Sequence, residues 1–177
     1  MSWKNLFGEE GTAVAEKMQP PAPVKVHIRW MIRRDVEEVL AIEAASFDCP
    51  WLEKDLIRCL RQRNCIGMVA EHENRVAGYM VYELDRKRIR LLNLAVAVDL
   101  RGRGVGSQMI AKLKAKLTEK RRNRITLKIR ESNLTGQIFF RGLGFRAIKI
   151  LKAFYDTGET AYEMEFWNHS DAKCKGK

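Results

Sequence analysis

A short run of arginine and glycine has the residue types and the spacing best suited to chemistry in this sequence. Residues 101–106 read Arg-Gly-Arg-Gly-Val-Gly, and they stand between an apolar run at 91–98 and an amphipathic stretch at 107–117. The first flank predicts a buried strand, and the second predicts a helix with one apolar face. The first N–H groups of a helix lack internal partners, and the helix dipole adds partial positive charge there. The run therefore predicts a loop that binds an anion such as a phosphate.

The glycine spacing separates this loop from two common nucleotide-binding loops. A Walker A loop ends in Gly-Lys followed by Ser or Thr, and this loop does not. A Rossmann loop is followed about twenty positions later by an acidic residue that binds a ribose. Here the corresponding region, residues 121–124, reads Arg-Arg-Asn-Arg. Both nucleotide-binding assignments are therefore disfavoured.

Hydrophobic periodicity predicts the elements that position the loop. Helices are expected from the cap residue Asp35 to near residues 46–51, and then at 52–62, 107–117 and 133–143. Strands are expected at 26–31, 66–72, 76–84, 91–98, 125–129, 145–154 and 161–167. This order predicts an α/β fold, with a mixed central sheet of about seven strands and helices on both faces.

Length and composition indicate one domain that needs neither disulfides nor metal. The 177 residues are expected to form a domain at 25–167 between flexible tails at 1–24 and 168–177. Neither a membrane span nor a signal peptide is expected, because no apolar run is long enough and the N-terminus lacks an apolar segment behind a basic start. The scattered cysteines, Cys49, Cys59, Cys65 and Cys174, do not form metal-binding pairs. They favour a cytoplasmic, reducing environment.

The net charge of +11 has more than one interpretation. A positive field would concentrate a polyanionic ligand near the protein or hold the protein close to RNA. A solvated basic surface without a partner explains the charge equally well. No aromatic motif typical of RNA-binding domains accompanies the charge.

Taken together, the element order and the motifs resemble the GNAT acetyltransferases over residues 26–167. Arg-x-x-Gly-x-Gly, formed by Arg101, Gly104 and Gly106, is the pyrophosphate-loop pattern of that family. The other matching segments are Phe-Asp-Cys-Pro-Trp at 47–51, Leu-Asn-Leu-Ala-Val at 92–96, Arg-Glu-Ser-Asn at 130–133 and Leu-Gly-Phe at 143–145. Pro-Trp together with Arg-x-Ser-Asn is similar to the ribosomal-protein alanine N-acetyltransferases and related protein N-terminal acetyltransferases.

The resemblance implies that acetyl-CoA binds where the fourth and fifth strands splay apart, with no metal. Gly104 and Gly106 would let the backbone approach the pyrophosphate, and the backbone of Leu94 and Val96 would hold the pantetheine arm. Asn133 would contact the cofactor, although a plain helix cap explains this residue too. The cofactor-binding residues implied by the resemblance are Leu94, Ala95, Val96, Arg101, Gly102, Arg103, Gly104, Val105, Gly106, Ser107, Asn133 and Phe140.

The acceptor implied by the resemblance is a protein N-terminal α-amine, and the expected protein is a ribosomal protein with an N-terminal alanine. An α-amine with a pKa of about 7.7 to 8.0 has a useful neutral fraction near neutral pH. The substrate-binding residues expected from the resemblance are Pro50, Trp51, Tyr82 and Tyr155. The basic surface would suit an acceptor near RNA, but it would repel a basic N-terminal peptide.

Two positions depart from the family pattern in catalytic roles. The ribosomal enzymes have a glutamate base at position 128 and the family has a tyrosine acid at position 140, whereas this chain has Lys128 and Phe140. Lys128 could act as a base if it is desolvated among other cations, or it could pair with an acidic group or an acidic substrate. Besides Lys128, Tyr155 and Glu83 are predicted catalytic residues. Glu131 is a further candidate, although its place at a helix start suits support of the helix dipole.

The sequence is also compatible with two other functions. The same fold could acetylate a small-molecule amine. Alternatively, the loss of both catalytic side chains favours a degenerate domain that binds CoA or RNA as a regulatory module. Pro50, Trp51 and Tyr155 favour a peptide acceptor over a small amine.

Overall fold

The computed structural model describes residues 21–118 and 121–168, and its element order agrees with the sequence prediction. The elements are β1 (His27–Trp30), η3 (Arg33–Asp35), α1 (Val36–Ala44), α2 (Glu53–Leu60), β2 (Cys65–His72), β3 (Arg75–Leu84), β4 (Arg88–Val96), η4 (Val98–Leu100), α3 (Val105–Lys114), β5 (Arg124–Arg130), α4 (Leu134–Gly142), β6 (Arg146–Leu151) and β7 (Ala161–Trp167). None of the helices in the described part of the chain is both long enough and apolar enough to cross a membrane.

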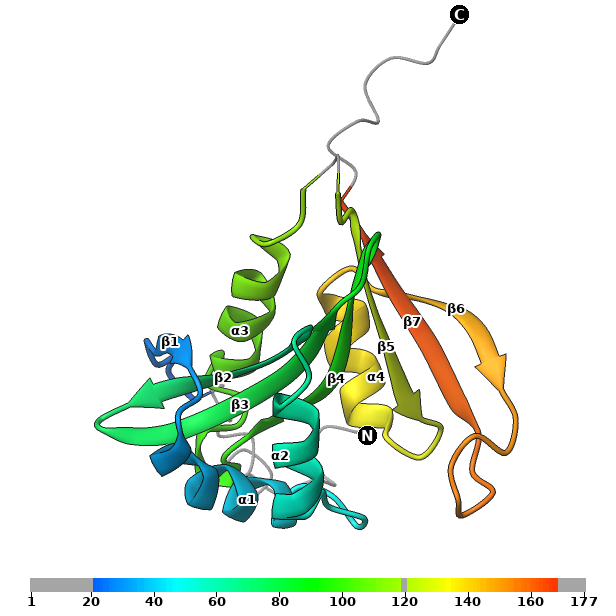
Figure 1. Ribbon diagram of the computed structural model, residues 1–177. Coiled ribbons are helices and arrows are strands. Elements are labelled where there is room, and N and C mark those ends of the chain that lie inside the picture. Colours follow the sequence, from blue (N-terminus) through cyan, green and yellow to red (C-terminus); the bar gives the residue numbers. More distant parts are fainter. Residues whose placement is uncertain (1–20, 119–120, 169–177) are drawn as a thin grey trace, which may run out of the picture.

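The seven strands form one mixed sheet in the order β1-β2-β3-β4-β5-β7-β6 (Figure 1). β4 and β5 form the parallel pair, and all other neighbours run antiparallel. The parallel register extends from Arg88↔Arg124 to Leu91↔Leu127 and then stops. Beyond this point β4 and β5 diverge, so the predicted splay between the fourth and fifth strands is confirmed.

Helices cover the two faces of the sheet unequally. α3 and α4 lie on one face, where the larger apolar core forms, and α1 and α2 lie on the other (Figure 1). The core beneath α1 and α2 is built on strand residues such as Val69 of β2, Tyr79 of β3 and Ala95 of β4. On that side β5, β7 and β6 carry no helix in Figure 1. The sheet therefore presents an open surface next to the fork between β4 and β5.

Two boundary differences and one capping difference from the prediction have local reasons. α3 begins at Val105, not at residue 107, because Gly104 takes a left-handed conformation at the helix start. β4 begins at Arg88 instead of residue 91, because residues 88–90 continue the ladder with β5 and β3. Asp35 does not cap α1 through its side chain; its carboxylate instead accepts from the Ile32 N–H and pairs with Arg29.

Part of the predicted N-terminal tail packs against the glycine loop. The Val24 N–H donates to the Arg103 carbonyl at 3.0 Å, and Gln108 Nε2 donates to the Val24 carbonyl at 2.7 Å. Val24 is buried in the core beside α3. Within the predicted tails, residues 1–20 and 169–177 lie outside the described residues.

Candidate active site

The glycine loop forms a cradle of backbone donors at the start of α3. Gly102 and Gly104 have φ angles of 73° and 80°, a region that suits glycine. Within the described residues, the N–H groups of Gly102, Arg103 and Gly104 donate to no backbone carbonyl. The first turn of α3 leaves further N–H groups without a partner inside the helix. Oriented donors without partners beside a helix N-terminus suit a phosphate group.

Arg101 fixes the cradle to the rest of the fold. Its Nε donates to the Val96 carbonyl at 3.1 Å, and its Nη2 donates to Ser46 Oγ at 2.8 Å. The loop is therefore tied both to the end of β4 and to the segment after α1. A Cβ atom at Gly106 would lie 3.0 Å from Cζ of Phe139, so glycine also permits close packing of α3 against α4.

A pocket of about 570 Å³ extends from the cradle along the end of β4. The β4–β5 register stops at Leu91, so β4 has an unpaired backbone edge from Leu92 to Val96 on the side of the fork. The predicted cofactor residues lining this pocket are Leu94, Ala95, Val96, Arg101, Gly102, Gly104, Val105, Gly106, Ser107, Asn133 and Phe140. Arg103 does not line it, because its Nε donates to the Ala22 carbonyl. The phosphate cradle and the free strand edge fit a phosphorylated ligand with an amide-containing arm.

Asn133 lies where this pocket meets a second one. Its Oδ1 accepts from the Gly136 N–H at 2.8 Å, so it caps α4, as one of the two interpretations predicted. It also lines both pockets. The capping bond holds its side chain at the junction, so the two interpretations are compatible.

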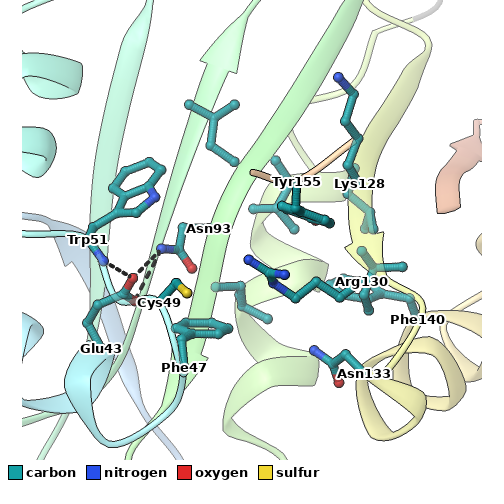
Figure 2. A pocket seen from close by; sticks show the side chains of 15 residues that line it. Glu43, Phe47, Cys49, Trp51, Asn93, Lys128, Arg130, Asn133, Phe140 and Tyr155 are labelled. Carbon is teal, nitrogen blue, oxygen red and sulfur yellow. Dashed lines mark hydrogen bonds between the residues drawn. The ribbon is translucent and has the colours of Figure 1, made fainter. Parts of the chain in front are cut away.

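The second pocket, of about 280 Å³, lies on the α1–α2 side of the fork (Figure 2). The segment between α1 and α2 contributes Phe47, Cys49 and Trp51, and the β6–β7 loop contributes Tyr155. The remaining lining residues are Glu43, Leu91, Leu92, Asn93, Leu94, Leu127, Lys128, Ile129, Arg130, Asn133 and Phe140. Both pockets are lined by Phe47, Leu94, Asn133 and Phe140. Two ligands that enter from opposite faces of the sheet would therefore meet at the fork.

A buried carboxylate, which sequence reasoning missed, fixes one wall of this second pocket. Glu43 is only 2% exposed and accepts hydrogen bonds from the Trp51 N–H at 2.8 Å and from Asn93 Nδ2 at 3.1 and 3.2 Å (Figure 2). It also accepts a hydrogen bond from the Tyr79 hydroxyl. Burial raises the pKa of Glu43, and the bonds from Trp51 and Asn93 oppose this shift. Glu43 thus joins α1, β3 and β4 to the segment that carries Trp51.

Glu159 fixes the opposite wall. Its Oε1 accepts from the Ser132 N–H at 3.0 Å and from Ser132 Oγ at 2.6 Å, and its Oε2 pairs with Arg130 Nη1 at 2.6 Å. The Arg130 guanidinium stacks on the Tyr155 ring, with Cζ 3.8 Å from the ring centroid. Burial raises the pKa of Tyr155, so this phenol keeps its proton at neutral pH. Glu159 therefore holds the loop that presents Tyr155.

We expect Glu159→Gln to remove the part of the pH dependence of folding stability that comes from the Glu159 carboxylate. The Ser132 hydrogen bonds, together with Arg130, lower the pKa of Glu159 from 4.5 to about 2. A carboxylate whose pKa is lower in the folded state than in the unfolded state stabilises the fold at pH values above the unfolded-state pKa of 4.5. This stabilisation is lost as the pH falls from 4.5 towards the folded-state pKa of about 2. Urea unfolding from pH 7 to 2 should show wild type more stable than the variant above pH 4.5, with the two converging below it. A constant difference across this range would contradict the assignment.

The structure separates the predicted catalytic and substrate-binding residues into two groups. Trp51, Lys128 and Tyr155 line the second pocket, and Pro50 immediately precedes Trp51. Tyr82 lies in the core rather than in the cleft, because its ring points into the core packed against α3 and its hydroxyl contacts Met68 Sδ at 3.7 Å. Glu83 pairs with Arg90 at 2.5 Å and lines none of the four pockets described for this part of the chain.

Glu131 and Lys128 have surroundings that bear on proton transfer. Glu131 Oε1 accepts from the Tyr162 hydroxyl at 3.3 Å. Lys128 is exposed, and its Nζ lies 4.1 Å from the centroid of the Phe154 ring. Burial among cations, the condition under which Lys128 would act as a base, is not the geometry observed. Phe140 packs edge-on against Phe139 and Phe145 with centroid separations of 5.1 and 5.3 Å, so an aromatic cluster stands where the resemblance implied a tyrosine acid.

Comparison with known proteins agrees with this geometry. The profile of the Acetyltransferase (GNAT) family matches residues 34–145. An uncharacterized N-acetyltransferase of Methanocaldococcus jannaschii is 30% identical over 138 residues, which cover 77% of this chain and 88% of that protein. The ribosomal protein bS18-alanine N-acetyltransferase of Haemophilus influenzae is 26% identical over 121 residues, which cover 68% of this chain and 82% of that protein.

The fold is shared with a solved structure of the same kind. The crystal structure of the ribosomal-protein-S18-alanine N-acetyltransferase from Escherichia coli superposes with a TM-score of 0.72 at 21% identity. The superposition covers 81% of this chain and 94% of that one. At this identity the likeness concerns the fold alone.

Proposed function

The chain belongs to the acetyltransferase (GNAT) family and is an N-acetyltransferase, and on this basis we propose that it transfers an acetyl group from acetyl-CoA to the N-terminal α-amine of a protein. The observation that carries the proposal is the meeting of the two pockets at the fork between β4 and β5. The acceptor that we put first is a ribosomal protein with an N-terminal alanine, because a relative bears that activity in its name. We also propose a cytoplasmic location, which the scattered cysteines favour. The net charge of +11 would also suit an acceptor close to RNA.

The residues of the larger pocket fit acetyl-CoA in two places. The N–H groups of residues 102–107 and the positive end of α3 would hold its pyrophosphate. The free edge of β4 between Leu92 and Val96 would bind its amide-containing arm through strand-like hydrogen bonds. When bound, acetyl-CoA supplies an acetyl group activated as a thioester.

The residues of the smaller pocket would orient the acceptor. The amine nitrogen attacks the acetyl carbonyl, an N–C bond forms and the C–S bond breaks. The amine gives up a proton, and the departing sulfur takes one. We assign the proton donation to Tyr155, whose pKa is raised by burial, and the removal of the amine proton to water, since an α-amine is partly neutral near pH 7. Holding the two reactants together supplies much of the acceleration.

Lys128 takes an acceptor-binding role in this proposal. Its exposed ammonium, which contacts the Phe154 ring, is placed to meet an incoming chain. Lys128 is exposed, whereas proton abstraction by a lysine requires a buried amine.

Mass spectrometry of acetyl transfer tests the proposed acceptor class. Purified protein is incubated with acetyl-CoA and one acceptor in each reaction. The acceptors are peptides that begin with alanine, serine or methionine, and small amines such as spermidine. We expect acetylated peptides, with alanine- or serine-starting peptides preferred. Acetylation of the small amines alone would contradict the proposal, and so would acetyl-CoA binding without transfer to any peptide.

A further inference from the structure

The smaller pocket continues onto the open face of the sheet. A third pocket of about 510 Å³ lies over β4, β5, β7 and β6, and it shares Leu91, Leu92, Leu127, Lys128 and Tyr155 with the smaller pocket. No helix covers β5, β7 or β6 on this side in Figure 1. An acceptor chain whose amine lies at the fork can therefore leave the smaller pocket across this surface.

Arginines on this face are already paired with carboxylates. Arg90 pairs with Glu83 at 2.5 Å and with Asp85 at 3.1 Å. Arg88 pairs with Asp85 at 3.1 Å and lies 4.0 Å from Glu163. The same pattern continues beside the pocket, where Arg124 pairs with Glu165 and Arg130 pairs with Glu159. These guanidinium charges are therefore neutralised within the fold.

Two lysines on the same face are not neutralised in this way. Across the described ranges 21–118 and 121–168, neither Lys128 nor Lys149 has a carboxylate oxygen within 4.0 Å of its ammonium. Both are exposed, and both line the third pocket. In the sheet register Lys128 lies opposite Glu163, and Glu163 lies opposite Lys149. Lys128, Glu163 and Lys149 thus form a row across β5, β7 and β6, with two lysines and one carboxylate. Arg88 also contacts this carboxylate.

The spacing of the two lysines matches a short stretch of extended chain. Neighbouring strands lie about 4.8 Å apart, so Lys128 on β5 and Lys149 on β6, with β7 between them, are about 10 Å apart. An extended peptide advances about 3.3 Å per residue, so about three residues span that distance. Lys128 lies beside the fork, where the α-amine binds in the proposed function. Lys149 lies further along the exit path.

We propose that this acetyltransferase prefers acceptors with acidic side chains shortly after the N-terminal residue, which contact first Lys128 and then Lys149. The inference rests on the proposed N-terminal acetylation and names its substrate class. Unpaired cations on the wall of a binding groove favour a partner of opposite charge and disfavour a basic one. The basic residues that follow some N-termini would meet the same lysines and be repelled.

The test compares three peptides that share an N-terminal alanine and a common C-terminal half. Residues 2–5 of the peptide are Glu-Gly-Glu-Glu, Gln-Gly-Gln-Gln or Lys-Gly-Lys-Lys. We expect kcat/KM in the order acidic, neutral, basic, with about a tenfold span between the first and the last. Lys149→Gln should reduce the acidic-to-neutral ratio about twofold, and Lys149→Glu should bring it to one or below. Lys112→Gln, an exposed position on α3, makes the same change in net charge away from this face and should leave the ratio unchanged.

The outcomes distinguish this inference from the proposed function. Equal kcat/KM for the three peptides would overturn the acidic preference and leave N-terminal acetylation standing. Transfer to none of them would overturn both. A loss of preference in Lys112→Gln equal to that in Lys149→Gln would show that net charge alone, and not the lysine row, selects the acceptor.

Discussion

Gly104→Glu should raise the dissociation constant for acetyl-CoA at least about 100-fold, because two effects act together at this position. Gly104 has a φ of 80°, which is unfavourable for a residue with a side chain. The new carboxylate would also stand at the start of α3, in the pocket where the loop N–H groups and the helix dipole would bind a pyrophosphate. Isothermal titration calorimetry with acetyl-CoA measures the change, and circular dichroism shows whether the variant is folded.

Gly158→Glu is the matched control for this prediction. Gly158 also has a φ of 80°, and a Cβ atom there would meet no atom within 4 Å. It lies in the β6–β7 loop and lines neither the cofactor pocket nor the acceptor pocket. The control therefore introduces the same backbone strain and the same charge, and we expect its affinity for acetyl-CoA to match wild type. A folded Gly104→Glu protein with unchanged affinity would show that the loop does not bind the cofactor.

Glu43→Ala should lower the free energy of unfolding by about 2 to 4 kcal/mol, since it leaves buried donors without an acceptor. The Trp51 N–H, the Asn93 amide and the Tyr79 hydroxyl all donate to this one carboxylate. The same change frees the segment that carries Trp51, so the KM for a peptide acceptor should rise more than kcat falls. Chemical denaturation and steady-state kinetics measure the two effects.

Glu37→Ala provides the comparison on the same helix. Glu37 is exposed on α1, and we expect its replacement to change the free energy of unfolding by no more than about 0.5 kcal/mol. Equal stability losses in the two variants would contradict the role assigned to Glu43. An unchanged KM in Glu43→Ala would show that the Glu43 network does not position the acceptor.

Local patterns made the element order and the cofactor loop predictable. Gly102 and Gly104 mark a turn with positive φ angles, which few residue types other than glycine adopt. The flanking periodicities identify a strand and a helix without knowledge of the rest of the chain. The splay between β4 and β5 followed from the family resemblance. Its register, which ends at Leu91↔Leu127, required the structure.

Features that depend on distant partners were not predictable. Glu43 meets Tyr79 and Asn93, which lie 36 and 50 residues away in the chain. One signal was available: Glu43 falls on the face of α1 that also bears the apolar residues Val36 and Val39. Tyr82 was predicted to bind substrate, but together with Met80 it lies on the face of β3 that packs into the core beneath α3. The row formed by Lys128 and Lys149 likewise exists only through the strand register.

We propose that the acetyl group reaches a protein N-terminal α-amine at the fork between β4 and β5. The most direct measurement uses a single peptide that has both a free α-amine and an internal lysine, incubated with acetyl-CoA and sequenced by tandem mass spectrometry. We expect the added acetyl group on the α-amine with wild-type protein and no product with Gly104→Glu. Acetyl groups found only on the lysine side chain, or equal product from the two proteins, would contradict the account.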